Sequence, residues 1–204
     1  MADDSDAAPG PSRLEQQIAF LLEADRLKGV LRRSRLINED RLENSGEHSW
    51  HFALATLVLA EHCPEPVDLL KVLRMALIHD LVEIDAGDTF VYDEVGKDDQ
   101  AAREQAAADR IFGLLPEDQA RAFRADWDEF EAARTAEARL ARAVDRLLPL
   151  LHNCHTRGAA WRKHGVNAGQ VVAINRVIEH GAPDLWTYAR RLIDEAVRDG
   201  NLEA

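Results

Sequence analysis

The residues best suited to chemistry lie in one apolar stretch, residues 69–84, which carries His79, Asp80 and Glu83. Its apolar side chains recur around nearly the whole circumference of a helix, a pattern typical of a buried helix at the centre of a domain. Burying an unpaired carboxylate is costly, so buried acids are normally paired, protonated or bound to a metal. Two carboxylates and a histidine on such a helix therefore indicate a site for a divalent metal ion.

A tightly held divalent ion needs at least three protein ligands, and an adjacent histidine–aspartate pair supplies two. A further ligand can come from the helix that we expect over residues 44–61. His48 lies in its first turn and His51 lies one turn later on the same face, so either histidine could reach the ion. On residue type alone, His48 could equally cap its helix or face the solvent.

Asp145 is another candidate ligand, because it lies inside an apolar helical stretch over residues 140–151. Pairing with Arg142 or Arg146 on the surface of the same helix is a serious alternative, since charged pairs at such spacing are common. A shell of two histidines and two aspartates suits a borderline divalent ion. The ligand types do not separate manganese, cobalt, zinc, iron and magnesium, so we expect one divalent ion of unspecified identity.

Two further acids follow the histidine–aspartate pair. Glu83 lies one turn beyond His79 and could orient a metal-bound water or relay its proton. Asp88 lies on a turn built on Gly87 and is a second candidate for acid–base chemistry or substrate contact. A turn-forming role explains Asp88 nearly as well, because aspartate is common in turns.

A basic segment within residues 30–44 could bind an anion in a chain whose net charge is −12. Arginine presents a planar fork of donors that matches a phosphate group. Arg32 is our candidate phosphate ligand, with Arg33 beside it. Without a metal site, a solvated basic loop would be the default interpretation of this segment.

Taken together, His48, the His79-Asp80 pair and Asp145 resemble the HD-domain metal-dependent phosphohydrolase superfamily. Within it, the chain is similar to the YfbR-like 5′-deoxynucleotidase branch over residues 14–151. The similarity is carried by residues 27–33, 41–50 and 78–88 and by the helix that contains Asp145.

The resemblance implies hydrolysis of deoxynucleoside 5′-monophosphates to nucleoside and phosphate, often by a dimer. It implies that His48, rather than His51, joins His79, Asp80 and Asp145 as a metal ligand. By the same resemblance, Glu83 would be catalytic, Arg32 would bind phosphate and Asp88 would contact the substrate. Arg33 stands where the branch can carry an aromatic residue, so it bears on selectivity for deoxyribose.

Other functions fit the same residues. One is a phosphohydrolase for a different phosphate ester, such as a nucleotide sugar or a nucleoside di- or triphosphate. Another is a metal-stabilised nucleotide-binding protein without turnover, although Glu83 argues for catalysis. A third is a helical protein with a purely structural metal.

Composition limits the partners and the compartment. The acidic net charge disfavours a nucleic-acid polymer or an anionic membrane as partner. Cys63 and Cys154 form no short-spaced pair, so neither a disulfide framework nor a thiolate zinc site is indicated. The longest apolar run, residues 52–60, is too short to cross a bilayer. We expect a cytoplasmic protein that acts on a small nucleotide or phosphate ester.

The pattern of apolar residues, caps and breakers predicts an all-α fold: one helical bundle around the central buried helix. We expect a disordered tail over residues 1–11 and a single domain over residues 12–204. Leu14, Ile18, Leu21 and Leu22 form the apolar stripe of a first helix expected over residues 12–28, and no strand is expected. Residues 155–166, with Trp161, should form a surface excursion. The remaining expected helices cover residues 44–61, 69–84, 99–112, 116–133, 135–154, 167–180 and 183–199, with a loop over residues 90–98.

Overall fold

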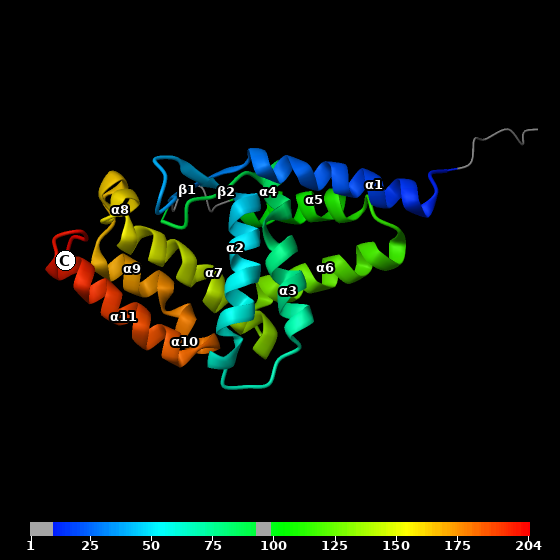
Figure 1. Ribbon diagram of the computed structural model, residues 1–204. Helices are drawn as coiled ribbons and strands as arrows, with labels where there is room; N and C mark the ends of the chain where they lie inside the picture. The colour runs from blue at the N-terminus through cyan, green and yellow to red at the C-terminus, as the bar shows by residue number, and fades with distance from the viewer. Residues whose placement is uncertain (1–9, 93–98) are drawn as a thin grey trace, which may run out of the picture.

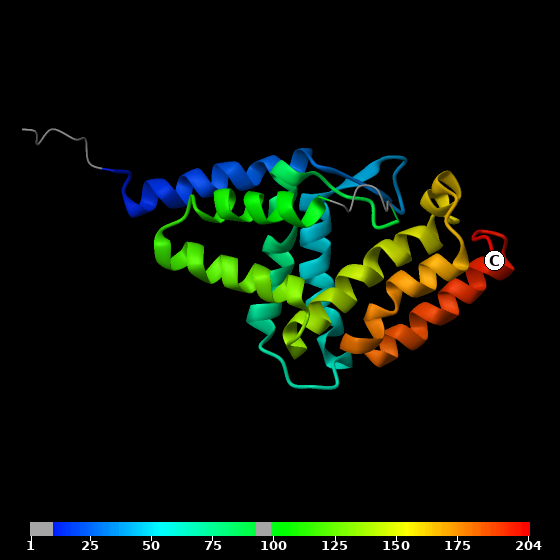
Figure 2. The same cartoon turned by 180° about the vertical axis from the view of Figure 1, so that it is seen from behind.

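The computed structural model describes residues 10–92 and 99–204, which form a bundle of helices with one small antiparallel sheet (Figures 1 and 2). The predicted all-α fold is confirmed apart from that sheet. The expected tail falls largely on residues 1–9, and the expected loop largely on residues 93–98. Both of those stretches lie outside the described residues.

The elements follow one another along the chain with short connections. The first half contains α1 Arg13–Ala24, β1 Leu31–Arg35, β2 Leu42–Asn44, α2 Ser45–Leu59, α3 Leu69–Ile78 and α4 Glu83–Ala86. The second half contains α5 Gln100–Phe112, α6 Glu117–Ala132, α7 Ala136–His155, α8 Ala159–His164, α9 Ala168–Asn175, α10 Val177–Gly181 and α11 Pro183–Arg198. The helix expected over residues 167–180 is therefore divided into α9 and α10.

Two apolar cores hold the helices together. The larger core joins α2, α3 and α7 to the closing helices and contains Phe52, Leu148 and Trp161. The smaller core joins α1, α5 and α6 to the turn after α3 and contains Phe112 and Trp127. Figure 1 shows α2 and α3 between these two ends of the molecule. Residues from α2, the end of α3 and α7 can therefore meet near the middle.

The start of α2 is set by its own side chains. The Asn44 side-chain oxygen accepts a hydrogen bond from the Glu47 backbone N–H at 2.9 Å, and the Glu47 carboxylate accepts one from the Asn44 backbone N–H at 3.1 Å. This reciprocal cap satisfies donors that a helix start leaves unpaired. It fixes the first turn of α2, which carries His48.

The central helix is shorter than expected. The chain leaves α-helical geometry at Ile78, passes through a 3₁₀ turn at His79–Val82, and resumes in the short helix α4. The expectation of one continuous helix over residues 69–84 was wrong, and so was its burial all round, because Leu70 and Leu77 are exposed. The Trp127 indole N–H donates to the His79 carbonyl oxygen at 3.2 Å, which holds the turn against α6.

The expected apolar face of α1 does not enter a core. Leu14 and Leu22 are 66% and 69% exposed, and Ile18 and Leu21 are exposed as well. Phe20 is buried instead, because α1 packs on α5 and α6 through a different face, where the Phe20 ring meets Phe123 edge-on.

The basic segment after α1 contains the two strands that the sequence did not predict. β1 and β2 pair in antiparallel fashion, with Leu31 opposite Asn44 and Arg35 opposite Leu42, and an irregularity lies between these pairs. Alternation along β1 leaves Arg33 exposed and turns Arg32 toward the interior. The sheet therefore aims one arginine at the centre of the molecule.

The segment after α7 is not a surface excursion. Trp161, on α8, is 1% exposed and belongs to the larger core. Among the described residues, no helix is both long and apolar enough to cross a membrane.

Candidate metal centre

Two of the candidate ligands come from helices far apart in the sequence. His48, in the first turn of α2, and Asp145, in the middle of α7, are both buried. His48 Nε2 lies 3.0 Å from Asp145 Oδ1. Burial lowers the pKa of His48 to about 4, so its imidazole is neutral and able to act as a ligand at neutral pH.

The turn after α3 brings the other pair to the same place. His79 Nε2 lies 3.0 Å from Asp80 Oδ1 and 3.8 Å from Asp145 Oδ1. His79 Nδ1 lies 3.0 Å from the Ala76 carbonyl oxygen, which can only accept, so Nδ1 carries a hydrogen. In the neutral ring, the lone pair on Nε2 then faces two carboxylates, and this buried atom has no hydrogen-bond partner among the described residues.

This arrangement suits a cation. One ligand atom each from His48, His79 and Asp145 lies within 4.8 Å of the others. Burial alone would lower the pKa of His79, but the charges of Asp80 and Asp145 and a hydrogen bond to Asp80 together outweigh it and raise the pKa. The electrostatics at His79 Nε2 therefore favour a positive charge between ring and carboxylates, which a metal ion can supply in place of a proton.

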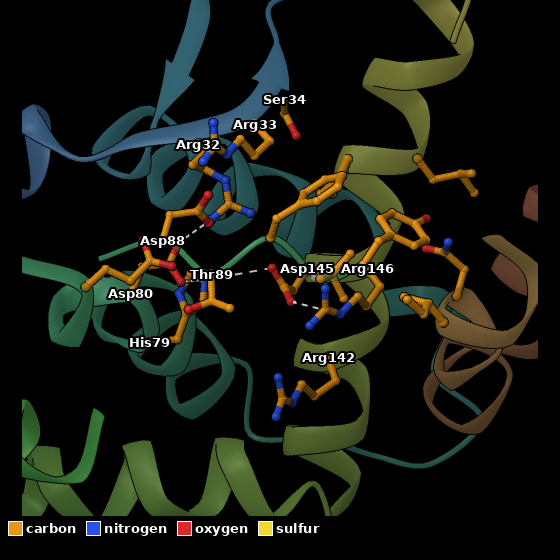
Figure 3. A pocket seen from close by; sticks show the side chains of 18 of the residues that line it. Arg32, Arg33, Ser34, His79, Asp80, Asp88, Thr89, Arg142, Asp145 and Arg146 are labelled. Atoms are coloured by element: carbon orange, nitrogen blue, oxygen red, sulfur yellow. Dashed lines mark hydrogen bonds and ion pairs between the residues drawn. The ribbon is translucent and has the colours of Figure 1, made fainter. Parts of the chain in front are cut away.

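Arg32 is the basic residue that lies closest to the four candidate ligands. The Arg32 Nη1 donates to Asp80 Oδ2 at 2.7 Å, so one carboxylate contacts both His79 and Arg32 (Figure 3). Burial alone would raise the pKa of Asp80, but the neighbouring charges of His79 and Arg32 lower it. Asp80 is therefore ionised, and Arg32 is held where it can also face an anion bound beside the ligands.

Glu83 lies next to the ligand group without being one of the four. The Ser45 hydroxyl donates to Glu83 Oε2 at 2.6 Å and positions this carboxyl group. Burial and the charge of Asp80 raise the pKa of Glu83 well above its ordinary value. A carboxyl group whose pKa is raised is suited to exchanging a proton with a reacting group.

A cavity of about 260 Å³ opens beside these residues. Asp88 and Arg33, two residues expected to contact the substrate, line it together with Arg32 and Glu83. Burial raises the pKa of Asp88, although Arg32 opposes this effect. The structure thus brings His79, Asp80, Glu83, Asp88, Arg32, Arg33 and Asp145 to a single cavity, with His48 beneath it.

The cavity also has walls that the sequence did not single out. Arg142 and Arg146 flank Asp145 on α7, and Arg142 stacks on the Phe130 ring at 4.6 Å while it pairs with Glu131 at 3.0 Å. Asp145 does face Arg146, at 3.8 Å, but its closer partner is His48. The alternative, in which Asp145 pairs with an arginine of its own helix, therefore accounts for the position of Oδ2 but not for that of Oδ1, which faces His48.

Aromatic residues form another part of this cavity wall: Phe90, Tyr92, Phe130 and Trp161. They come from separate segments, so their spacing in the sequence carries no signal. Tyr92 and Trp161 lie close enough for the hydroxyl of Tyr92 to interact with Trp161. The cavity thus combines a charged floor with apolar walls.

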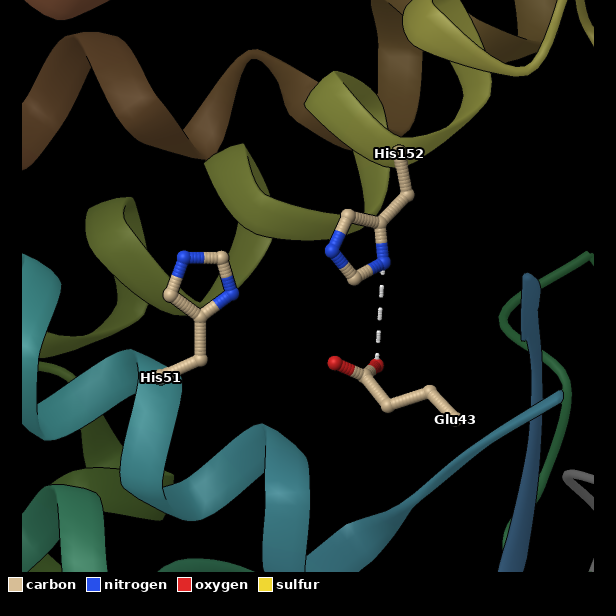
Figure 4. Close-up of side chains that lie close together, drawn as sticks. All are labelled: Glu43, His51 and His152. Carbon is tan, nitrogen blue, oxygen red and sulfur yellow. Dashed lines mark ion pairs between the residues drawn. The ribbon is translucent and has the colours of Figure 1, made fainter. Parts of the chain in front are cut away.

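His51, the alternative to His48, is placed elsewhere. Its ring stacks on His152 with a centroid separation of 5.8 Å, and both histidines lie near Glu43 (Figure 4). His152 is buried and faces Glu43 at 3.8 Å. Glu43 was not predicted at all, because an acid in a short polar segment carries no sequence signal of burial.

The helical fold and its internal group of histidines and aspartates define an all-α protein with a candidate metal centre beside a cavity. The chain belongs to the HD domain family, which matches residues 24–186. The resemblance to this superfamily is therefore confirmed.

Known proteins are similar over most of the chain. A structure from Magnetospirillum magnetotacticum MS-1, described as a predicted metal-dependent phosphohydrolase, is 51% identical with a TM-score of 0.92, covering 97% of this chain and all of that one. The 5′-deoxynucleotidase HDDC2 of Homo sapiens is 29% identical over 147 residues, which is 72% of this chain and 71% of that protein. The match to the Bos taurus protein of the same name is 29% identical and spans 63% of this chain and 62% of that protein.

Proposed function

We propose that this protein is a metal-dependent phosphomonoesterase that hydrolyses (deoxy)nucleoside 5′-monophosphates to nucleoside and phosphate. The observation that carries this proposal is the meeting of two histidines and two aspartates beside a cavity that also contains an arginine and an unusually basic carboxylate. The names of the related proteins, a metal-dependent phosphohydrolase and a 5′-deoxynucleotidase, support it.

In this proposal, His48, His79, Asp80 and Asp145 hold one divalent ion. The donor set fits because the Nε2 atoms of both histidines face carboxylate oxygens at 3.0 Å. Such an ion, when bound, lowers the pKa of a water molecule and polarises a phosphoryl oxygen. Manganese, cobalt, zinc, iron and magnesium all accept nitrogen and oxygen donors, so the identity of the ion is left to experiment.

The protein's own groups move the protons and hold the substrate. Glu83, positioned by Ser45, accepts the proton of the attacking water and returns it to the leaving nucleoside oxygen. Arg32 binds the phosphate with its planar fork, oriented by Asp80. Arg33 adds positive charge at the mouth of the cavity, and Asp88 contacts the sugar.

The substrate is small in this proposal. A cavity of about 260 Å³ lined by Arg32, Arg33, Arg142 and Arg146 supports a compact anion, and the aromatic wall can receive a base or sugar. The net charge of −12 supports a mononucleotide rather than a nucleic-acid polymer, because the chain as a whole repels a polyanion while four arginines in the cavity can contact a small one.

A homodimer is part of the proposal. Leu14 and Leu22 on α1, Leu57 and Val58 on α2 and Leu70 on α3 are all exposed, and contact with a second copy would remove such side chains from water. Light scattering should give twice the 22.8 kDa mass of the chain. A mass of a single chain at micromolar concentration would contradict the dimer.

The activity is tested by phosphate release from dAMP, dUMP and AMP with manganese, cobalt, zinc or magnesium added to metal-free protein. We expect release from at least one deoxynucleotide, dependent on the added ion. Nucleotide binding without release of phosphate from any ester would contradict the proposal and favour a binding protein. A comparison of dAMP with AMP measures selectivity for deoxyribose.

A further inference from the structure

A second group of histidine and acid side chains lies behind the candidate metal centre. It consists of Glu43 on β2, His51 on α2 and His152 on α7, and we call it the rear cluster (Figure 4). One ligand atom from each of the three residues lies within 4.8 Å of the other two. None of the three contributes to the cavity lining or to the four-residue centre proposed above.

The buried members of the rear cluster lack partners. Glu43 and His152 are 1% and 4% exposed. Glu43 Oε2 and His152 Nδ1 are fully buried atoms without a hydrogen-bond partner in the described chain, although they lie only 3.8 Å apart. Leaving such atoms unsatisfied destabilises the folded protein, so buried polar atoms normally have a partner.

Arg32 does not remove this deficit. Its Nε lies 3.5 Å from Glu43 Oε2, yet both atoms remain without a hydrogen bond among the described residues. The short contact of Arg32 is with Asp80, at 2.7 Å. Glu43 therefore keeps a buried carboxyl oxygen that the nearest arginine does not satisfy with a hydrogen bond.

We propose that Glu43, His51 and His152 bind a second divalent metal ion, of the zinc, cobalt or nickel class, at a site separate from the cavity. Two imidazole nitrogens and one carboxylate oxygen form a donor set typical of these ions. Ligand–metal distances of about 2.0–2.2 Å allow two ligand atoms on one ion to lie as far apart as about 4.2 Å. The 3.8 Å between Glu43 Oε2 and His152 Nδ1 meets that limit.

The protonation states and the accessibility of the cluster fit this role. Burial lowers the pKa of His152 to about 4 and also lowers the pKa of His51, so both rings are neutral with a free lone pair at neutral pH. His51 is only half-buried and stacks on the exposed Trp50, at a centroid distance of 6.0 Å. An ion can therefore enter from the surface at His51 without passing through the cavity.

The second ion would lie next to a ligand of the first. Glu43 Oε2 is 3.8 Å from His48 Nδ1, while His48 Nε2 faces Asp145. Carboxylates behind metal-ligating histidines orient the ring and raise its basicity. An ion that fixes Glu43 therefore also fixes the position of His48, so loading the rear cluster strengthens binding at the front.

The test is metal stoichiometry, which does not depend on activity. The full chain, stripped with a chelator, is dialysed against zinc or cobalt alone, and bound metal is measured by mass spectrometry. We expect about two ions per wild-type chain and about one for His51→Ala and for Glu43→Gln. The matched control is His155→Ala, an exposed histidine at the end of α7, which should retain about two ions.

A second background isolates the rear cluster. In Asp145→Asn, which weakens the front centre, about one ion should remain, and cobalt should give a visible absorption band that disappears when His51→Ala is added. Circular dichroism identifies variants that are folded. If Asp145→Asn is unfolded, the difference between wild type and His51→Ala decides the question alone.

One bound ion in the wild type would overturn the proposal, and so would two ions that persist in both His51→Ala and Glu43→Gln. A third outcome would also overturn the second site: Glu43→Gln loses only the front ion, while His51→Ala binds as many ions as the wild type. That result would show that Glu43 only orients His48.

Discussion

Two groups of histidines and acids lie on opposite sides of the His48 ring, and they differ in what surrounds them. The front group, with His79, Asp80 and Asp145, borders a cavity that contains arginines. In the described part of the chain, Glu43, His51 and His152 of the rear cluster do not line that cavity, and of the three only His51 is partly exposed. The donor types are alike on both sides. The two groups therefore differ in access rather than in ligand type. A substrate can reach the front group through the cavity, whereas the rear cluster has room for an ion alone.

The largest expected effect is on the front group. Asp145→Asn removes one negative charge from the ligands and leaves His48 without its anionic partner at 3.0 Å. Loss of an outer partner of a metal ligand costs about 10–100-fold in affinity or activity, so loss of a ligand should cost more. We expect phosphate release to fall by more than about 100-fold, measured at a saturating metal concentration. Activity within tenfold of wild type would show that Asp145 is not a ligand.

Glu83→Gln should separate chemistry from metal binding. Glutamine can still accept the Ser45 hydrogen bond but cannot take up a proton, and general acid–base groups contribute about 10²–10⁴-fold to rate. We expect kcat to fall in that range while bound metal and KM change little.

The matched control for Glu83 is Asp85→Asn on the same short helix, because Asp85 pairs with Arg110 outside the cavity. Its kcat should stay within twofold of wild type. Equal losses in the two variants would show that α4 is merely sensitive to substitution and would remove the catalytic role of Glu83.

Arg32→Lys should have a smaller effect, mainly on substrate binding. Lysine keeps the charge but loses the planar fork that can face Asp80 and a phosphate together. Hydrogen bonds to charged groups contribute about 1.5–3 kcal/mol, so kcat/KM should fall by about 10–100-fold, mostly through KM.

Arg35→Lys is the control for Arg32, since Arg35 pairs with the exposed Asp40 and does not line the cavity. A fall in kcat/KM for Arg33→Lys that exceeds the fall for Arg32→Lys would move the phosphate site toward the mouth of the cavity.

The smallest expected effect is on stability, and it involves both groups. Burial lowers the pKa of His48 and of His152 to about 4. Between the ordinary histidine pKa of about 6.5 and pH 4, the unfolded chain therefore binds more protons than the folded protein, and stability falls as the pH falls. Glu43, whose pKa burial raises to about 7, acts in the opposite direction, because its contribution is lost as the pH rises through 7.

Calorimetry of the metal-free protein at pH 6.5, 5.5 and 4.5 measures this dependence. Because the raised pKa values of Glu43 and Glu83 oppose the two histidines, the prediction concerns a difference between proteins: relative to His152→Gln, the wild type should lose several degrees of Tm across the series, since 1 kcal/mol corresponds to roughly 2–4 °C for a chain of this size. The fall should be smaller in His152→Gln and unchanged in His155→Gln. An equal slope in all three proteins would show that His152 is not buried in its neutral form.

Much of the helical fold could be predicted from local signals. The capping pairs Ser12 with Glu15 and Asn44 with Glu47 mark helix starts that the structure shows. Pro183 opens α11 as expected. These signals succeed because caps and breakers act within a few residues of the chain. The break at His79–Val82 was missed because no proline or glycine lies there, and contacts with other helices shape the turn.

The site shows the same division. His48, His79, Asp80 and Asp145 were recognised by type, context and resemblance, and the structure places them together, while their role as ligands stays a prediction. His51 and His152 could not be assigned, because neither the face of α2 that meets α7 nor the burial of Glu43 is encoded locally. The strands that aim Arg32 inward were missed for a related reason, since their pairing joins residues about ten positions apart.

The sequence by itself determined that the protein is a helical bundle, which residue types can do its chemistry, and which superfamily they resemble. Only the tertiary structure decided which histidine faces which carboxylate and which of the two groups borders a cavity. It also decided that Glu43 is buried between His48 and His152. The physical reason is range: helix propensity and capping act over a few residues, whereas burial, pKa and metal geometry depend on contacts between distant segments, such as those of His48 and Asp145, which lie 97 positions apart in the chain.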